Sequence, residues 1–389
     1  LKYDYSSDSS LSSENNDIIT DHEYQILNNK YILLKYIARG SYAYVWLAYN
    51  FIDNHFVAIK IFNEEEDIEI VTNEISISLK MNKNNFHLKY FEHFKYNKQQ
   101  CLVMELMGYT LYDIFDKIST QFPLKIIKTI AIKMLKSIEQ LHSDKLIHND
   151  LKLENFITNI PIPALQKLIS YLKEKDIGGI WNNLIIDNTP PLLENMNIKK
   201  RKKIKRKIKI KMFPTYQQKI INLINEYNET TDPENETTDP ENKITDPENN
   251  LQLLDINWDT LNIKLIDFSN TSYENEEEVD ENDDIQLRCY RSPETVLGEG
   301  IYLSSDIWSL GCIFYEMITG EYLFQINPNL SFYERDKEHL SLMIDYLGKI
   351  PIEMCMELNK SNLLFDNKGK LLNYTKYTTS TTLLELITT

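Results

Sequence analysis

Apolar and polar positions follow different periods in different parts of the chain. Between residues 31 and 107, segments such as YILLKYIARGSYAYVWLAYN and HFVAIKIF are rich in β-branched and aromatic residues, with Gly, Asn and Asp between them. This pattern is typical of antiparallel strands. One stretch, EDIEIVTNEISISLKM, changes to helical spacing, so we predict a small first lobe of five strands and one helix.

From residue 108 onward the apolar spacing becomes helical, as in IIKTIAIKMLKSIEQLHSDK. We therefore predict a second, mainly α lobe made of residues 108–158 and 261–389, and an α+β fold with two lobes. Residues 1–30 are rich in Ser, Asp and Asn and have little periodicity. They predict a disordered segment in front of the first lobe.

Residues 159–260 break the pattern of the second lobe and are predicted to be a spacer insertion. One helix is expected there, at ALQKLISYLKEKD, and the remainder is predicted to be largely disordered. Residues 229–249 hold three copies of a seven-residue repeat, ETTDPEN, ETTDPEN and KITDPEN, and the proline in each copy excludes a helix. The basic run KKRKKIKRKIKIK (199–211) fits a nuclear import signal or a nucleic-acid patch, and equally a solvated run of charge.

Composition narrows the setting of the protein. With 389 residues, 42% of them hydrophobic, the chain can bury a sizeable core, and its formal charge of −16 favours basic partners and disfavours general binding of nucleic acid. The four cysteines are scattered without a CxxC pair, so neither a disulfide framework nor a zinc site is expected. Since no apolar run approaches the roughly 20 residues of a membrane span and no signal peptide is evident, we predict a cytoplasmic or nuclear location.

Two segments of the first lobe carry residues suited to holding a nucleotide phosphate. VAIK at 57–60 puts Lys60 on a predicted strand, where its ammonium could hold the α- and β-phosphates of ATP. Glu74, in the helical segment NEISISLK, is the natural ion-pair partner of this lysine. Either residue alone would be an ordinary surface charge.

The second lobe carries the matching catalytic groups. In IHNDLKLENF (147–156), Asp150 could accept the proton of a substrate hydroxyl, Lys152 could neutralise the transferring phosphoryl group and Asn155 could hold a magnesium ion. Asp267 in LIDFSN could bind magnesium that bridges the phosphates. Phosphoryl transfer needs positioned charge more than covalent chemistry, and these residue types in this order supply it.

The segments RCYRSPE (288–294) and SSDIWSLGCIFYEMITGEYLF (304–324) follow in the order found in eukaryotic serine/threonine protein kinases. The resemblance covers about residues 31–158 and 261–376. It implies the two-lobed kinase fold, with ATP and Mg²⁺ as cofactors. It also implies a nucleotide site at Ile37, Gly40, Val45, Lys60, Glu74, Glu105 and Met107.

Within this class the chain resembles the SR-protein-specific kinases of the CMGC group. The shared features are the HxD loop with a small polar middle residue, the insertion after it, and YERDKEHLSLMIDYLGKIP at 333–351. The resemblance implies a monomer that phosphorylates basic, Arg/Ser-rich proteins. It places substrate docking on Glu338 and Asp345, two turns apart on one helix face, and Arg291 beside the substrate loop. Two ordinary solvated acids remain the alternative.

Some positions depart from the kinase pattern. Asn149 replaces the arginine that usually pairs with a phosphate on the activation loop, and SYENEEEVDENDD follows, so we predict activity without loop phosphorylation. The loop IARGSYAYV keeps Gly40 but has Ala38 and Ala43 at the other glycine positions. The second lobe is expected to be truncated before its last helices, which would leave Glu294 a buried acid without its arginine. The alternative to an active kinase is therefore a pseudokinase or split-gene fragment that binds basic partners, and a kinase of another specificity is a third possibility.

Overall fold

The structure is a computed structural model. It describes residues 22–40, 42–82, 85–118, 122–191, 193, 196–231, 256–274, 286–356, 364–372, 374 and 376. The predictions for residues 1–21, for most of the seven-residue repeat and for the acidic stretch at 275–284 lie outside the described residues.

The first lobe is one antiparallel sheet of six strands in the order β1-β2-β3-β4-β6-β5, with one helix after β4. The sequence predicted five strands. The sixth, β1, lies in the segment predicted to be disordered, where Leu27 is fully buried and pairs with Tyr31. The elements are β1 (Ile26–Leu27), β2 (Tyr31–Arg39), β3 (Ala43–Asn50), β4 (His55–Phe62), α2 (Ile68–Met81), β5 (Tyr90–Tyr96) and β6 (Gln99–Met104).

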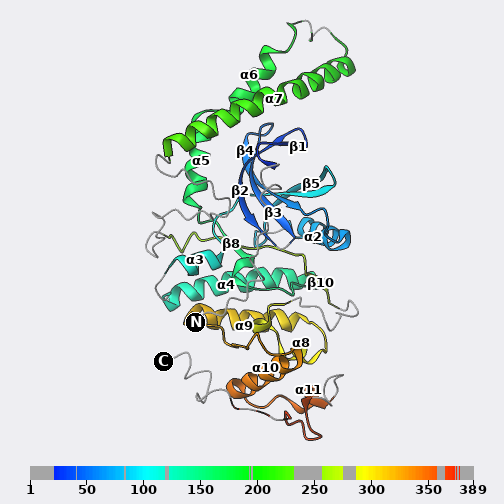
Figure 1. Ribbon diagram of the computed structural model, residues 1–389, viewed down its shortest axis with the longest axis vertical. Coiled ribbons are helices and arrows are strands. Elements are labelled where there is room, and N and C mark those ends of the chain that lie inside the picture. Colours follow the sequence, from blue (N-terminus) through cyan, green and yellow to red (C-terminus); the bar gives the residue numbers. More distant parts are fainter. Residues whose placement is uncertain are drawn as a thin grey trace.

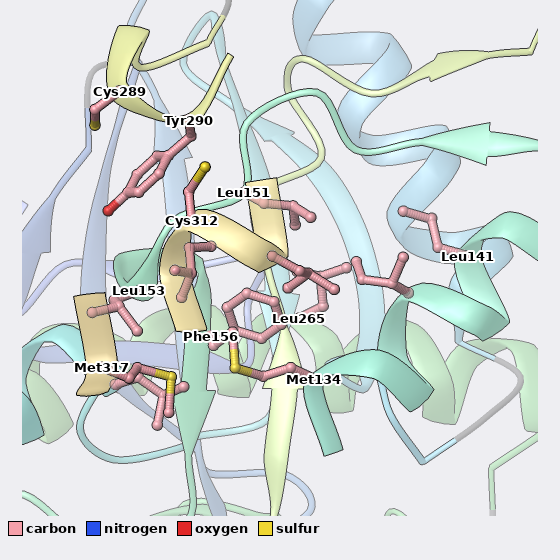
Figure 2. Packing of buried hydrophobic residues seen from close by; sticks show 14 of the residues in the cluster. Met134, Leu141, Leu151, Leu153, Phe156, Leu265, Cys289, Tyr290, Cys312 and Met317 are labelled. Atoms are coloured by element: carbon pink, nitrogen blue, oxygen red, sulfur yellow. The ribbon is translucent and has the colours of Figure 1, made fainter. Parts of the chain in front are cut away.

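The second lobe is mainly α, as its periodicity predicted. Figure 2 shows part of its core, in which Met134 of one helix meets Phe156 and Leu265 of two paired strands below the catalytic loop. Two short antiparallel pairs, β7 with β10 and β8 with β9, carry the loops between the lobes. The elements are α3 (Leu111–Lys117), α4 (Leu124–Ser143), β7 (Leu146–Ile147), β8 (Phe156–Thr158), β9 (Ile263–Leu265), β10 (Ser272–Tyr273), α8 (Pro293–Leu297), α9 (Leu303–Thr319), α10 (Phe332–Leu347) and α11 (Ile352–Met356), with 3₁₀ turns at Leu153–Asn155 and Arg288–Tyr290.

The insertion is structured to a greater extent than the sequence predicted. Instead of one helix, the described part of the insertion forms three α-helices: α5 (Pro163–Glu174), α6 (Ile177–Asp187) and α7 (Ile198–Thr231). The basic run is part of α7, and the prediction of a largely disordered insertion is wrong for this region. Figure 1 shows α6 and α7 beyond the sheet, at the end of the molecule farthest from α10 and α11.

A hydrophobic core of its own explains why the insertion is folded. Buried side chains at four-residue spacing form a stripe along α7, which is the helical period. They pack with Trp181 of α6 against apolar residues of β2 and β3. The stripe consists of Met212, Tyr216, Ile220 and Ile224.

This core lies on the sheet face that also carries the predicted phosphate-binding lysine. Val45 stands opposite Lys60 in the register of β3 and β4, and Leu47 and Tyr49 follow at two-residue steps on the same face. Leu47 and Tyr49 pack against the insertion helices, whereas Val45 packs against the main core. The insertion and the cleft between the lobes therefore share one face of the sheet.

No helix within the described ranges is both long and apolar enough for a bilayer span. The longest, α7, is dominated by charged and polar residues. The four cysteines are all buried and free.

Candidate active site

Three charged residues from three separate elements meet between the lobes. Lys60 on β4 approaches Glu74 of α2, with 2.5 Å between Nζ and Oε1, and Asp267 after β9, with 3.4 Å between Nζ and Oδ1. The Glu74 side chain is almost fully buried at 4% exposure, whereas that of Asp267 remains 35% exposed. The carboxylate of Glu74 thus fixes the lysine from the buried side, and that of Asp267 approaches it from a side chain that is partly open to solvent.

The charges of Lys60 and Asp267 reinforce each other, whereas burial raises the pKa of Glu74 despite the nearby ammonium of Lys60. Burial disfavours the ammonium form of Lys60, but the carboxylates of Asp267 and Glu74 outweigh it and hold the pKa of Lys60 above its ordinary value. Burial would raise the pKa of Asp267, yet the Lys60 charge prevails and lowers it. Both groups therefore stay charged throughout the neutral range.

The catalytic loop brings its three predicted residues together. Lys152 Nζ lies 2.8 Å from Asp150 Oδ2, and Asn155 Nδ2 donates to the Asp150 carbonyl oxygen at 2.7 Å. Burial opposes the charge of Lys152, but Asp150 outweighs it and raises the pKa of the lysine. The loop is therefore held in one shape by its own side chains.

A fully buried acid that the sequence analysis did not single out anchors this loop. Asp306 of α9 accepts hydrogen bonds from the backbone N–H groups of His148, at 2.9 Å, and Asn149, at 3.2 Å. His142 Nε2 also lies 2.8 Å from Asp306 Oδ2. In the sequence, only the position of Asp306 in the segment SSDIWSLG could have drawn attention to it. Nothing in that segment shows that its carboxylate binds a loop more than 150 residues away.

Asn149 connects the catalytic loop to the start of the activation segment. Its side chain is buried, and Nδ2 donates to Asn270 O at 2.7 Å and to Ser272 Oγ at 2.9 Å. Its backbone has φ of 69°, a left-handed conformation that asparagine tolerates better than most residues. Two neutral hydrogen bonds from Asn149 therefore link the catalytic loop to the segment that follows Asp267.

The two predicted magnesium residues, Asn155 and Asp267, lie on neighbouring backbone, since Ile266 N donates to Asn155 O at 3.0 Å. Among the described residues no three His, Cys, Asp or Glu side chains gather as a metal-binding group. Magnesium, however, usually takes one or two protein oxygens and completes its shell with phosphate and water. Asp267 offers a carboxylate, and because Asn155 uses its amide nitrogen on Asp150, its amide oxygen is the atom suited to a cation. The two residues fit magnesium that arrives with a nucleotide.

The other predicted nucleotide residues lie on β2 and β3, in the turn between them, and in the segment directly after β6. Gly40 closes the β2–β3 turn, with its N–H donating to Ala43 O at 2.8 Å. Ile37 packs against the core of the insertion, and Met107 packs against the main core. Glu105 binds Lys264 and accepts a hydrogen bond from Lys89 N at 2.6 Å, so it braces the hinge through its side chain.

The hinge, the segment 105–110 between β6 and α3, contains Gly108, where a side chain has no room. Gly108 N donates to Thr158 O at 2.7 Å, and Tyr109 N donates to Ile160 O at 2.9 Å. A Cβ at Gly108 would lie 1.5 Å from the carbonyl oxygen of Ile160. Hinge backbone and the beginning of the insertion are thus in direct contact, which the sequence analysis did not foresee.

The predicted docking residues are less exposed than a substrate groove would require. Glu338 is buried and accepts a hydrogen bond from Asn327 N at 2.8 Å, whereas Asp345 is half-buried and bound to Tyr374. Arg291 is buried, and its Nε and Nη2 donate to Gln286 O at 3.0 and 2.8 Å. Of the two acids, Asp345 is the one with a carboxylate near the surface, and the docking role stays a prediction.

Glu294 does not match the expectation of a buried, unpaired acid. It is half-buried, and Oε1 accepts hydrogen bonds from the hydroxyls of Ser304 and Ser305, each at 3.3 Å. The start of α9 brings these hydroxyls to the carboxylate. A buried ion pair between Arg288 and Asp336, 2.5 Å long, lies nearby and had no counterpart in the sequence analysis.

The protein kinase domain family matches residues 31–167 and 241–387 of this chain. The chain therefore belongs to the protein kinase family, and the predicted two-lobed fold with an insertion in the second lobe is confirmed.

Curated relatives refine this assignment. The chain is 26% identical to the protein kinase dsk1 of Schizosaccharomyces pombe, covering 90% of this chain and 71% of dsk1. It is 25% identical to the serine/threonine-protein kinase SRPK of Physarum polycephalum, over 89% of this chain and 74% of that protein. It is 24% identical to the serine/threonine-protein kinase AFC1 of Arabidopsis thaliana, over 91% of this chain but only 60% of AFC1. The predicted resemblance to SR-protein-specific kinases is confirmed at the level of the family.

Proposed function

We propose that this chain is a serine/threonine protein kinase that transfers the γ-phosphoryl group of Mg-ATP to basic, Arg/Ser-rich proteins. The observation that carries the proposal is the meeting of Lys60 and Glu74 from one lobe with Asp267 of the other. The residue before Asp267, Ile266, in turn donates a backbone hydrogen bond to Asn155 of the catalytic loop. Family resemblance alone would also fit a protein that has lost its chemistry. A binding module has no need to keep this set of charges in contact.

Lys60 and Glu74 would hold the nucleotide. The ammonium stays charged between its two carboxylates and would bind the α- and β-phosphates, while Glu74 fixes its position from the buried side. Asp267 and Asn155 would hold magnesium, which when bound neutralises the charge that develops on the phosphates.

Asp150 would take the proton of the attacking hydroxyl. Its side chain is 13% exposed and so is not sealed off from solvent, which suits a general base that must meet a substrate hydroxyl. Lys152, 2.8 Å away, would stand beside the oxygen that attacks and offer its charge to the phosphoryl group in transfer. The lysine two positions after the base is typical of kinases that act on serine or threonine.

Activity without phosphorylation of the activation loop follows from Asn149. Its two hydrogen bonds to Asn270 and Ser272, together with the pairing of β10 and β7, hold the beginning of the segment without an added phosphate. Phosphatase treatment is therefore expected to leave the rate of transfer unchanged.

A preference for basic substrates is supported by charge. The chain carries −16 overall, and Asp345 adds an acid near the surface of α10. Guanidinium groups of an Arg-rich peptide pair well with carboxylates. A monomer acting in the cytoplasm or nucleus stays our prediction.

The test is transfer of labelled phosphate from Mg-ATP to an Arg-Ser repeat peptide by the full chain. Asp150→Asn should lower the rate by about 10²–10⁴-fold because the general base is lost. Asp187→Asn, which alters an exposed acid at the end of α6, is the matched control and should behave like the wild type.

The outcomes separate the parts of the proposal. Equal transfer to an acidic Glu-Ser peptide would refute the substrate class but keep the kinase. Absence of transfer to either peptide, from protein shown to be folded, would refute the kinase and favour a module that binds basic partners.

A further inference from the structure

The helix α7 has two halves of different character. Its second half carries the buried stripe that joins the insertion to the sheet. Its first half contains residues 199–211, with eight lysines, two arginines and no acid. With −16 overall and +10 in this segment, the rest of the chain carries −26. The basic half is therefore a concentrated positive region on a strongly acidic protein.

Most of these basic side chains are exposed. Eight of the ten are exposed and two, Arg201 and Lys209, are half-buried, and none forms an ion pair with any residue that the structure describes. Figure 1 shows that α7 runs across the far end of the molecule, away from the helices of the second lobe. The segment is therefore accessible to a large partner without obstruction from the catalytic lobe.

The placement of these charges opposes helix stability. Like charges four residues apart, such as Lys199 with Lys203 and Lys203 with Lys207, repel each other on a helix. Lys199, Lys200 and Arg201, in the first turn of α7, also meet the positive end of the helix macrodipole. A bound polyanion would relieve both effects, so the arrangement favours a ligand of dense negative charge.

The density of these charges suits the phosphate backbone of a nucleic acid. Thirteen residues of α-helix extend about 20 Å, which gives about one positive charge per 2 Å. Duplex DNA carries about one negative charge per 1.7 Å of its axis. We propose that the basic half of α7 binds the phosphate backbone of duplex DNA without reading its sequence.

Other polyanionic partners fit less well. A membrane helix needs an apolar face, but the exposed large apolar residues of this region are only Ile198 and Ile210, and Ile208 is turned into the insertion core. Residues 199–211 contain no Asn or Gln and only two arginines, so contacts to phosphate are favoured over contacts to base edges. The net charge had predicted no direct binding of nucleic acid, but the helix separates its charge from that of the rest of the chain.

Anisotropy of a fluorescein-labelled 20-base-pair DNA, titrated with the full chain at several salt concentrations, tests the proposal. One variant replaces four exposed lysines of the basic half by glutamine, which preserves helix propensity: Lys199, Lys202, Lys203 and Lys207. The control variant removes the same number of exposed lysines elsewhere, so both variants have the same net charge: Lys98, Lys125, Lys128 and Lys136.

We expect the wild type and the control to bind alike and the α7 variant to bind at least about tenfold more weakly at 0.1 M salt. Its salt slope should also fall by up to about 3.6, since each phosphate contact contributes about 0.9. Equal weakening by both variants, or no binding by the wild type at 50 mM salt, would overturn the proposal. Tighter binding of an RNA duplex, polyglutamate or anionic vesicles than of DNA would overturn the choice of partner. Because none of these readouts involves phosphate transfer, they are independent of the proposed kinase activity.

Discussion

Replacement of Trp181 by alanine tests whether the insertion is an integral part of the first lobe. The indole is 2% exposed and lies with its ring centroid 4.6 Å from that of Phe51, which is in the turn directly after β3. It also lies 5.3 Å from Tyr216 and 5.7 Å from Phe213, both on α7. One side chain therefore contacts both the sheet and the longest helix of the insertion.

The expected loss of unfolding free energy in Trp181→Ala follows from the burial of the indole and from its ring contacts. Truncation of a buried tryptophan to alanine costs about 3–5 kcal/mol, because apolar area is lost and a cavity remains. The direct contact between Trp181 and Phe51 should appear as a coupling of about 0.5–1.5 kcal/mol in a double-mutant cycle with Phe51→Ala. The loss should concentrate in α6 and α7, since the main core of the second lobe does not include this residue.

Urea denaturation gives the free energies of the cycle, and hydrogen exchange measures protection of the α7 amides. Phe91→Ala, at a residue that is 40% exposed, is the matched control and should cost far less. A loss below about 1 kcal/mol in Trp181→Ala, with unchanged exchange in α7, would refute the reasoning. The insertion would then be a tethered segment and not part of the core.

Three further predictions concern the hinge, the cleft and the activation segment. Gly108→Ala should lower the free energy of unfolding by about 1–3 kcal/mol or more, because the new methyl group overlaps a facing carbonyl oxygen. The control Gly311→Ala, with no atom within 4 Å of its Cβ position, should be neutral or slightly stabilising. Equal shifts of the two melting temperatures would contradict this. The pKa of Asp267 is lowered in the folded state, so its contribution to stability is present above the unfolded pKa of about 3.9 and is lost as pH falls through the folded value. The difference in unfolding free energy between the wild type and Asp267→Asn should therefore be constant from about pH 6 to 9 and shrink below about pH 4; a difference that already changes near neutrality would refute the assignment. Asn149→Ala removes two hydrogen bonds, each worth about 0.5–1.5 kcal/mol. It should slow phosphate transfer about tenfold and raise the rate of amide exchange near Ser272. Unchanged exchange there would show that the Asn149 side chain does not hold the start of the activation segment.

Much of the catalytic set could be predicted because it is encoded locally. The residues of the catalytic loop lie within six positions of one another, and the contacts between Asp150, Lys152 and Asn155 are all short-range. Even Lys60 and Glu74, on different elements, are only 14 residues apart. The order of such segments along the chain was sufficient to predict which residues would converge.

The residues that hold this set in place could not be predicted in the same way. Asp306 anchors the catalytic loop across 158 residues, and Gly108 is constrained by a carbonyl oxygen more than 50 residues away. Nothing in the neighbourhood of either residue specifies its partner. Glu338 likewise is buried and accepts a hydrogen bond from Asn327, and this depends on where the loop between α9 and α10 packs.

The sequence by itself determined the periods of strands and helices, the division into two lobes and the order of the catalytic motifs, because these depend on side chains that are neighbours along the chain. Tertiary structure alone decided that the insertion would fold. The stripe of α7 has helical spacing, yet a helix whose first half is crowded with like charges needs a surface on which to bury the other half. That surface is the sheet of the first lobe, where Phe51 meets Trp181, and contacts over such separations are set by packing and not by local pattern.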